Sequence, residues 1–471
     1  MKILLTGATG YIGKRLLPVL IEMGHEVVCC ARDVDRFHIP QSFLGKVEVI
    51  EVDLLKKDSL ENIPKDIDGA YYLVHSMSVS SDYQNLERES AKNFKTYLNQ
   101  TSVQQVVYLS GIINEANLSE HLTSRKNVEK ELGKGNYALT VLRAGIIIGS
   151  GSASFEIIRD LIEKLPVMIT PIWLKTKCQP IGIADVILFL SRTLFVEKTY
   201  SNNYDIGGPD ILSYKEMLLQ FASVRNLKRS IFIVPVMTPR LSSYWLYFVT
   251  STSYKLACAL VNSMKIEVVC RNQILNDILK IKPLTYRHAL ENAFQRVQNN
   301  SIISSWKDAY VSSGIDSHLS DYIQVPSFGC FVDQRAQRFS NKRDCLNRVW
   351  SIGGSTGWYY GDWLWQLRGI LDKMSGGVGL RRGRTNEQEV NAGDALDFWR
   401  VIYANKEEGR LLLYAEMKLP GEAWLEFKVV HNKLEQTATF RPLGLLGRLY
   451  WYSVFPFHGF IFKGMLDKLT E

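Results

Sequence analysis

Across residues 1–210, short apolar runs alternate with longer segments in which apolar residues recur at helical spacing. The two clearest helical segments are Tyr83–Leu98 and Leu122–Leu132. The apolar runs are Ile3–Leu5, Val27–Ala31, Val47–Val52, Ala70–Val74, Val106–Leu109 and Leu139–Leu142. Strands that alternate with helices of this length need crossover connections, which are right-handed. The pattern therefore predicts an α/β domain with a doubly wound parallel Rossmann sheet.

The turn after the first apolar run reads Thr6-Gly7-Ala8-Thr9-Gly10-Tyr11-Ile12-Gly13. Three evenly spaced glycines between a strand and a helical pattern are typical of a dinucleotide-binding turn. Glycine permits the tight turn and lets the backbone approach a pyrophosphate, which the following helix N-terminus stabilises. We expect a dinucleotide to contact the residues of this turn, namely Gly7, Thr9, Gly10, Tyr11, Ile12 and Gly13.

The residues after the second strand bear on the choice of cofactor. The strand ends at Ala31 and is followed by Arg32 and Asp33. An acidic residue at this position binds a ribose hydroxyl, whereas a guanidinium offers planar donors to a 2′-phosphate. Arg32 therefore favours NADP(H), and Asp33, which can still reach a ribose hydroxyl, leaves NAD(H) open.

The character of the chain changes in its last third, which holds seven of the ten tryptophans. We expect residues 211–309 to form a helical connecting region and residues 310–471 a separate α+β domain. Its predicted strands are Leu411–Met417, Trp424–Val430 and Thr437–Phe440, and its closing helix is Leu445–Leu469. This order suggests a helix-grip architecture with an apolar cavity between sheet and helix. In the alternative, the tryptophans fill a core or face the first domain.

Composition adds few constraints. The net charge is +8, but the basic residues are spread along the chain, which argues against nucleic-acid binding. The seven cysteines show no metal-ligand spacing, and Met1 leads directly into the first strand, so we expect a cytoplasmic chain without bound metal. Tyr244–Val261 is too short and polar to span a membrane comfortably; a buried or surface-docked amphipathic helix is expected, with peripheral membrane contact left open.

Taken with two further motifs, Leu73-Val74-His75-Ser76-Met77 and Leu142–Gly149, the chain resembles the atypical short-chain dehydrogenases/reductases of the extended and regulator-like branch. More closely, it is similar to a bacterial group in which such a domain is fused to a C-terminal domain of unknown function. The segments Ser150–Glu156, Asp394–Val401 and Ala415–Gly421 carry that similarity. The resemblance implies that Asp53 and Leu54 meet the adenine edge and that Val74, His75 and Ser76 lie along the cofactor.

Reductases of this family use a serine at the end of the fifth strand and a Tyr-x-x-x-Lys pair on the next helix. Ser110 is in place here, but His121 and Arg125 stand where the tyrosine and lysine belong. In one interpretation His121 is a substitute acid and Arg125 holds the cofactor. In the other the domain binds nucleotide without turning it over.

The sequence therefore leaves two functions open. The first is an NADP(H)-dependent oxidoreductase acting on an apolar carbonyl or quinone-like small molecule, with the C-terminal domain helping to hold the substrate. The second is a non-catalytic NADP(H)-binding sensor or scaffold protein. The sequence names neither the substrate nor the oligomeric state.

Overall fold

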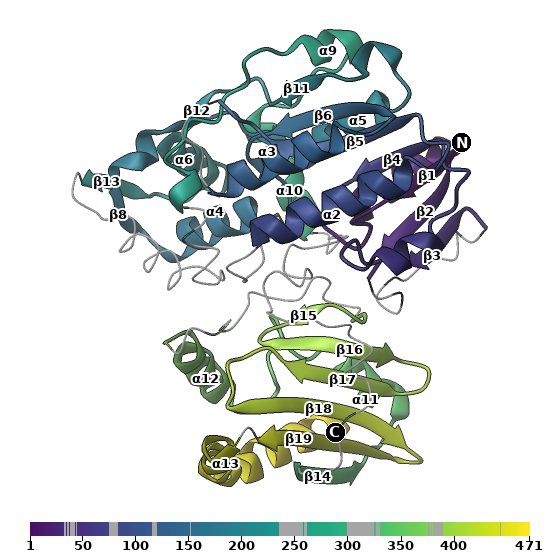
Figure 1. Ribbon diagram of the computed structural model, residues 1–471. Coiled ribbons are helices and arrows are strands. Elements are labelled where there is room, and N and C mark those ends of the chain that lie inside the picture. Colours follow the sequence, from purple (N-terminus) through teal and green to yellow (C-terminus); the bar gives the residue numbers. More distant parts are fainter. Residues whose placement is uncertain are drawn as a thin grey trace. The chain divides into compact units, whose positions relative to one another are not determined.

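The computed structural model describes residues 1–32, 34, 37, 43, 45–74, 83–114, 120–150, 152–234, 258, 261–298, 325, 330–374, 377, 379, 390–442 and 444–471. The chain divides into two compact units, Met1–Val311 and Ser312–Glu471, each with its own sheet (Figure 1). Most of Tyr244–Val261, for which an amphipathic helix is expected, lies outside the described residues.

The N-terminal unit is built on a seven-stranded parallel sheet in the order β11-β6-β5-β4-β1-β2-β3. Strand β1 lies in the interior, and the chain builds outward from it in both directions, which is a doubly wound topology. The predicted Rossmann sheet is confirmed. The strands are β1 (Lys2–Leu5), β2 (Glu26–Ala31), β3 (Val47–Glu51), β4 (Gly69–Tyr72), β5 (Gln105–Gly111), β6 (Ala138–Ala144) and β11 (Asn203–Ile206).

Helices cover both faces of this sheet (Figure 1). Alternate side chains of each strand point to opposite faces, so strands such as β1 are buried on both. Ile3 and Leu5 pack with α1 (Gly13–Glu22) and α5 (Ile183–Thr193), whereas Leu4 packs in the second core with α2 (Tyr83–Leu98) and α3 (Glu120–Leu132). This double burial explains why the sequence shows continuous apolar runs.

Further elements extend the unit at the side of β6 and β11. Helix α10 packs against α6, β7 and β10, so the described residues between 211 and 298, expected as a connecting region, form part of the N-terminal unit. Strand β13 pairs with β8 inside a stretch expected to be mostly helical. The bounds are β7 (Ile147–Ile148), α4 (Ala153–Lys164), β8 (Val167–Pro171), β9 (Lys177–Cys178), β10 (Ile181–Gly182), β12 (Leu212–Ser213), α6 (Tyr214–Val224), β13 (Ser230–Val234), α9 (Ile274–Leu279) and α10 (Tyr286–Gln298), with 3₁₀ turns η3 (Lys57–Asn62), η4 (Ile172–Lys175) and η5 (Glu197–Thr199).

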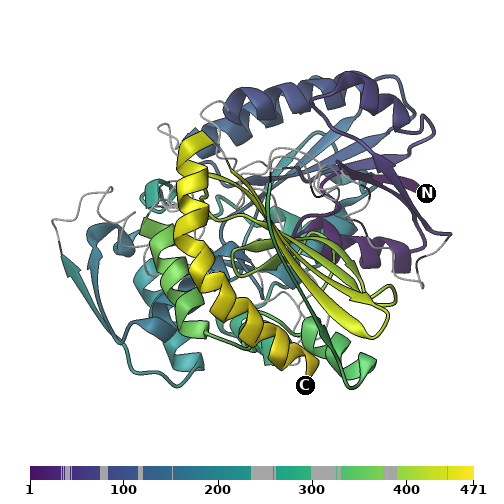
Figure 2. The same ribbon diagram turned by 90° about the horizontal axis from the view of Figure 1, so that it is seen from below.

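The C-terminal unit is a six-stranded antiparallel sheet in the order β14-β19-β18-β17-β16-β15. The helices α12 and α13 lie together across one face of the sheet, and α13 packs on β14 and β19 (Figure 2). A separate α+β unit is confirmed, with three strands more than the three expected. Its elements are β14 (Phe331–Arg338), α11 (Lys342–Val349), α12 (Asp362–Met374), β15 (Ala395–Leu396), β16 (Trp399–Asn405), β17 (Arg410–Ala415), β18 (Gly421–Val430), β19 (Lys433–Pro442) and α13 (Gly444–Thr470).

A buried ion pair joins two segments that carry the family resemblance. Arg400 on β16 donates from Nε to the carboxylate of Glu416 at 2.7 Å, and both side chains are fully buried. Arg400 also donates to the carbonyl of Gly393 at 2.7 Å. Removal of either partner would leave an unpaired charge buried in the core, which is strongly unfavourable. The pair therefore fixes how β16 and the end of β17 meet.

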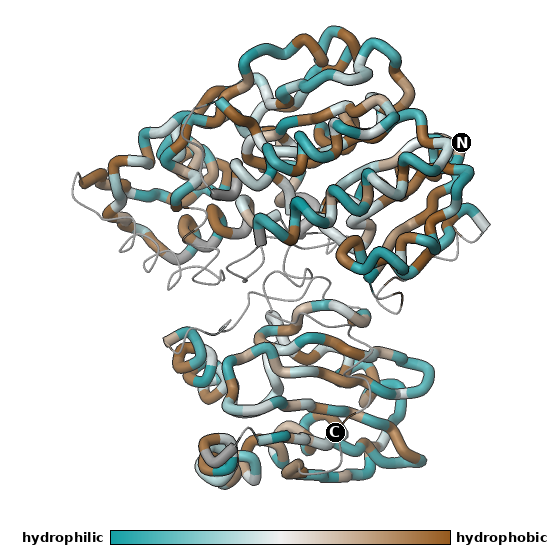
Figure 3. Tube along the Cα trace, viewed as in Figure 1, coloured by the Kyte–Doolittle hydropathy of each residue, from teal (hydrophilic) through white to brown (hydrophobic). Residues whose placement is uncertain are grey.

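Apolar segments run along the inner strands of both units (Figure 3). Among the residues that the structure describes, no helix has both the length and the apolar character needed to cross a membrane.

The C-terminal core contains one strongly perturbed histidine. His458 on α13 lies between the rings of Trp451 and Phe462, and burial lowers its pKa from 6.5 to about 4, although Asp333, at 3.7 Å, opposes the shift. Arg335, which pairs with Asp333, adds to the lowering.

We predict that this histidine makes the unit sensitive to acid. Between pH 6.5 and 4 the unfolded chain binds the proton more tightly, so the free energy of unfolding falls as pH falls through this window. The loss is on the order of 3 kcal/mol. Urea unfolding followed by tryptophan fluorescence measures the free energy of unfolding at each pH. Between pH 6.5 and 4 this free energy should change less in His458→Leu than in the wild type. In His431→Asn, a control at an exposed position, it should change as in the wild type. Equal slopes for His458→Leu and the wild type would contradict the assignment.

Candidate functional site

The glycine turn lies between β1 and α1. At two of its glycines, the backbone packs too closely for any side chain. Gly7 has a φ of +70°, and a Cβ there would lie 2.7 Å from the carbonyl oxygen of Leu73, just beyond β4. A Cβ on Gly13 would lie 2.3 Å from the carbonyl oxygen of Gly7. Any side chain at either position therefore forces backbone apart, and both glycines let α1 start close to the sheet.

Gly10 differs from the other two. It donates its N–H to the carbonyl of Gly7 at 2.9 Å, and a Cβ there would meet only that oxygen, at 3.1 Å, among the described residues. Among the described residues, the fold thus leaves one side of Gly10 open, two residues before Ile12, the N-cap of α1. The first turn of α1 contains Lys14 and Arg15 and no acidic residue, so the helix dipole and two cations favour an anion at this end.

Arg15 was not predicted from the sequence, yet it organises the turn. Its side chain is 5% exposed and lies over the ring of Tyr11 at 4.1 Å. It donates to the carbonyls of Tyr11, at 3.2 Å, and Ser150, at 2.9 Å. The glycine turn is thereby tied to the loop before α4. Thr9 and Ile12, both half-buried, complete the turn.

The residues expected along the rest of the cofactor follow β2, β3 and β4. Arg32 comes directly after β2 and is exposed, and Val74 follows β4 and is half-buried. Asp53 is held in a turn, because its Oδ1 accepts from the N–H of Leu55 at 3.1 Å and its own N–H donates to Ser59. The carbonyl of the buried Leu54 accepts from Asn93 at 3.0 Å.

His75 and Ser76, the remaining predicted cofactor residues, lie outside the described residues. Parallel strands that end at one edge bring the described positions to the same side of the sheet, as expected for a Rossmann site.

Ser110 lies near the end of β5 and is 2% exposed, beside Tyr108 on the same face of the strand. Arg125 on α3 donates to the carbonyl of Leu109 at 3.3 Å, so its guanidinium lies at the end of β5, where Ser110 stands. Burial raises the pKa of Tyr108 to about 12, with Arg125 and Ser110 opposing the shift. Tyr108 therefore stays protonated at neutral pH and is a poor substitute for the missing tyrosine.

His121 belongs to the first turn of α3, and its backbone stands one helical turn before Arg125. Its side chain is outside the described residues. The structure thus brings Ser110 and Arg125 together and leaves the role of His121 a prediction.

Two family models match the chain. Residues 3–111 match the NAD dependent epimerase/dehydratase family, and residues 330–465 match a family described as a protein of unknown function, DUF2867. The first match includes the glycine turn, Arg32 and Ser110, and the second covers most of the C-terminal unit.

Individual relatives are distant. Divinyl chlorophyllide a 8-vinyl-reductase of Arabidopsis thaliana is 23% identical over 227 residues, a match that covers 44% of this chain and 54% of the relative. A nucleoside-diphosphate-sugar epimerase from Staphylococcus aureus is 16% identical, with a TM-score of 0.49, over 62% of this chain and 100% of its own. UDP-glucuronic acid 4-epimerase from Bacillus cereus, solved with UDP-glucuronic acid and NAD, gives 16% identity and a TM-score of 0.47 over 64% and 99%.

The geometry predicts that alanine has different effects at two glycines of the turn. Gly13→Ala should lower the melting temperature, because its Cβ would lie 2.3 Å from a backbone oxygen. Gly10→Ala should melt close to the wild type but lose nucleotide affinity, because its Cβ would enter the open side of the turn. Calorimetric melting and titration with NADPH measure the two effects. If Gly10→Ala binds NADPH as well as the wild type, the open side of Gly10 is not the pyrophosphate site.

Proposed function

The N-terminal region of this chain belongs to the NAD-dependent epimerase/dehydratase family, and on that premise we propose that it is a nicotinamide-dinucleotide-dependent oxidoreductase with a preference for NADP(H). The observation that carries the proposal is the glycine turn. Gly7 and Gly13 are required by backbone packing, whereas Gly10 leaves an open side next to a helix N-terminus that holds two cations. A pyrophosphate carries the negative charge that such a helix end favours.

The described residues fit such a cofactor. Backbone N–H groups at the start of α1 would hold the pyrophosphate, Asp53 and Leu54 would meet the adenine edge, and Val74 would lie along the cofactor. Arg32, exposed at the end of β2, would pair with a 2′-phosphate and select NADP(H). When bound, the cofactor supplies or accepts a hydride.

The chemistry of the chain itself centres on the end of β5. The Ser110 hydroxyl would donate a hydrogen bond to a substrate oxygen, and the cation of Arg125, held at the carbonyl of Leu109, would stabilise negative charge there. His121, one turn before Arg125, would move the proton near neutral pH. An apolar carbonyl or quinone-like molecule is the proposed substrate, and the likeness to a protein named as a vinyl reductase supports a reductase acting on an apolar molecule.

A second function is favoured by one specific observation. Helix α3 carries His121 and Arg125 in place of a Tyr–Lys pair, and burial raises the pKa of the neighbouring Tyr108 to about 12. A site that lacks the Tyr–Lys pair on α3, and whose buried Tyr108 favours the neutral phenol, suits a protein that binds NADP(H) and responds in conformation or partner choice without turning the cofactor over.

We predict that turnover separates these functions. Oxidation of NADPH, followed by its absorbance, should occur with at least one member of a panel of apolar aldehydes, ketones and quinones. Ser110→Ala should slow it about ten- to a hundred-fold, the loss of one hydrogen bond to developing charge. If His121 is the acid, His121→Ala should slow turnover more at neutral than at alkaline pH, because the wild-type imidazole is already deprotonated at alkaline pH and can no longer donate. NADPH binding without turnover on the whole panel would favour the sensor.

Cofactor preference gives a second test. Arg32→Ala should weaken NADPH binding about ten- to a hundred-fold, as expected for the loss of a charge-assisted contact worth about 1.5–3 kcal/mol. NADH binding should be nearly unchanged. Arg192→Ala is the matched control, because Arg192 is an exposed cation in the last turn of α5, away from the carboxyl ends of the strands. Equal losses for both nucleotides would mean that Arg32 contacts adenine and does not select the phosphate.

A further inference from the structure

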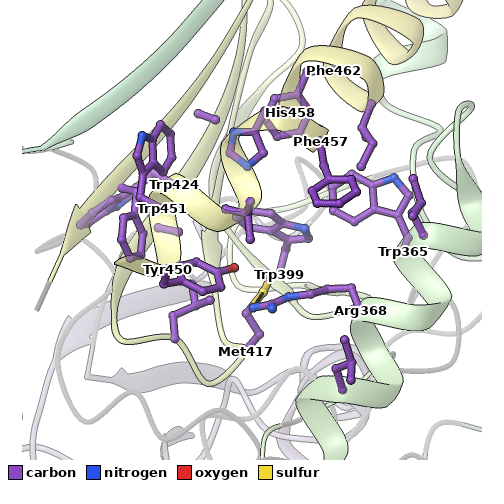
Figure 4. A pocket seen from close by; sticks show the side chains of 18 of the residues that line it. Trp365, Arg368, Trp399, Met417, Trp424, Tyr450, Trp451, Phe457, His458 and Phe462 are labelled. Atoms are coloured by element: carbon purple, nitrogen blue, oxygen red, sulfur yellow. Dashed lines mark hydrogen bonds between the residues drawn. The ribbon is translucent and has the colours of Figure 1, made fainter. Parts of the chain in front are cut away.

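The C-terminal unit contains a cavity of about 320 Å³ between the sheet and the helices α12 and α13. This volume is at the lower end of the range for small-molecule sites, about 300–1,000 Å³. Most of the lining is aromatic or aliphatic, contributed by both helices and by the strands β16, β18 and β19 (Figure 4). Ligand sites are commonly apolar cavities of this kind with a small number of polar groups in the lining.

The cavity opens to the surface through an apolar rim. Leu367 and Leu371 of α12 and Phe457 of α13 line it and are also 46%, 49% and 55% exposed. Large apolar side chains that are both lining and exposed leave a way in for an apolar molecule, which would cover them on binding.

Polar atoms in the lining lack partners. The indole nitrogens of Trp365 and Trp399 are buried and make no hydrogen bond within the described part of the chain. Trp399 as a whole is only 6% exposed. Buried donors without a partner are costly, so a ligand oxygen that accepted from them would gain free energy.

One cation lines this cavity. Arg368 extends from α12, and its guanidinium lies 3.4 Å from the sulfur of Met417, in the loop after β17, and 5.2 Å from the ring centre of Tyr450 on α13 (Figure 4). Among the described residues, Arg368 forms no ion pair with a carboxylate. Asp372, one turn later on α12, is occupied, because its two oxygens accept from the N–H groups of Lys418, at 2.7 Å, and Gly379, at 2.8 Å.

We propose that the C-terminal unit binds a small amphiphilic carboxylic acid, with its apolar body in the cavity and its carboxylate on Arg368. A guanidinium matches a carboxylate in planar geometry and charge, and the half-buried position strengthens the contact relative to open water. A single cation balances a single negative charge, whereas a phosphate dianion would leave charge uncompensated beside apolar walls. The site is independent of the function proposed for the N-terminal unit.

The test uses the intact chain and three probes of equal chain length: dodecanoate, methyl dodecanoate and dodecanol, titrated calorimetrically below their aggregation limits. Dodecanoate should bind best to the wild type. Arg368→Gln should weaken dodecanoate binding at least ten-fold and leave dodecanol unchanged. Arg448→Gln removes the same charge from an exposed position on α13 outside the cavity, and it should bind all three probes as the wild type does.

A second variant keeps the location testable. Ala438 of β19 lines the cavity, and Ala438→Leu would fill part of it, so all three probes should bind at least several-fold more weakly while circular dichroism confirms the fold. Equal affinity for dodecanoate and its methyl ester, or no effect of Arg368→Gln, would overturn the carboxylate assignment. Absence of binding by every probe to the folded wild type would overturn the site itself.

Discussion

The N-terminal unit depends on one close approach of backbone: the start of α1 is pressed against the turn that follows β1, and that turn against the end of β4. A Cβ on Gly13 would lie 2.3 Å from Gly7, and one on Gly7 would lie 2.7 Å from Leu73. Because side chains are excluded there, α1 can begin close to the sheet. The proposed anion site at the start of α1 depends on this same constraint, and the buried Arg15 ties the turn to the loop before α4.

The sheets of the two units are buried in different ways. The first buries a parallel sheet on both faces and leaves its polar chemistry at the edge where the strands end. The second packs its long helix on one side of an antiparallel sheet, places the ion pair of Arg400 and Glu416 inside, and keeps a cavity unfilled. Nucleotide chemistry suits the first arrangement, and holding an apolar molecule suits the second.

Much of the first sheet could be predicted, because strands buried on both faces give strong local signals. Tyr83–Leu98 is a helix as predicted, and the six apolar runs are strands. Strand β14 was missed because its sequence, FVDQRAQR, is largely polar and carries no strong local strand signal. It forms an edge strand by pairing with β19, about 100 residues later in the chain. Strand β13 was missed for a similar reason, since its partner among the described strands is the distant β8.

The candidate site shows the same division. The glycine motif and Ser110 are local signals, and the parallel sheet brings them to one edge. Arg15 and Arg368 carry no such signal, since an arginine in a helix looks like a surface residue until its neighbours are known. Only the folded chain reveals that Arg15 is buried on Tyr11 and that the guanidinium of Arg368 faces a thioether and an aromatic ring.

The central claim is that the turn between β1 and α1 holds the cofactor, and hydrogen exchange tests it most directly. The amides of the intact chain would be compared with and without saturating NADPH, using mass spectrometry of peptides. We expect slower exchange in peptides that cover Thr6–Gly13 and the segment around Arg32, with exchange in the C-terminal unit unchanged. Unchanged exchange in the glycine turn, or protection confined to other parts of the chain, would contradict it.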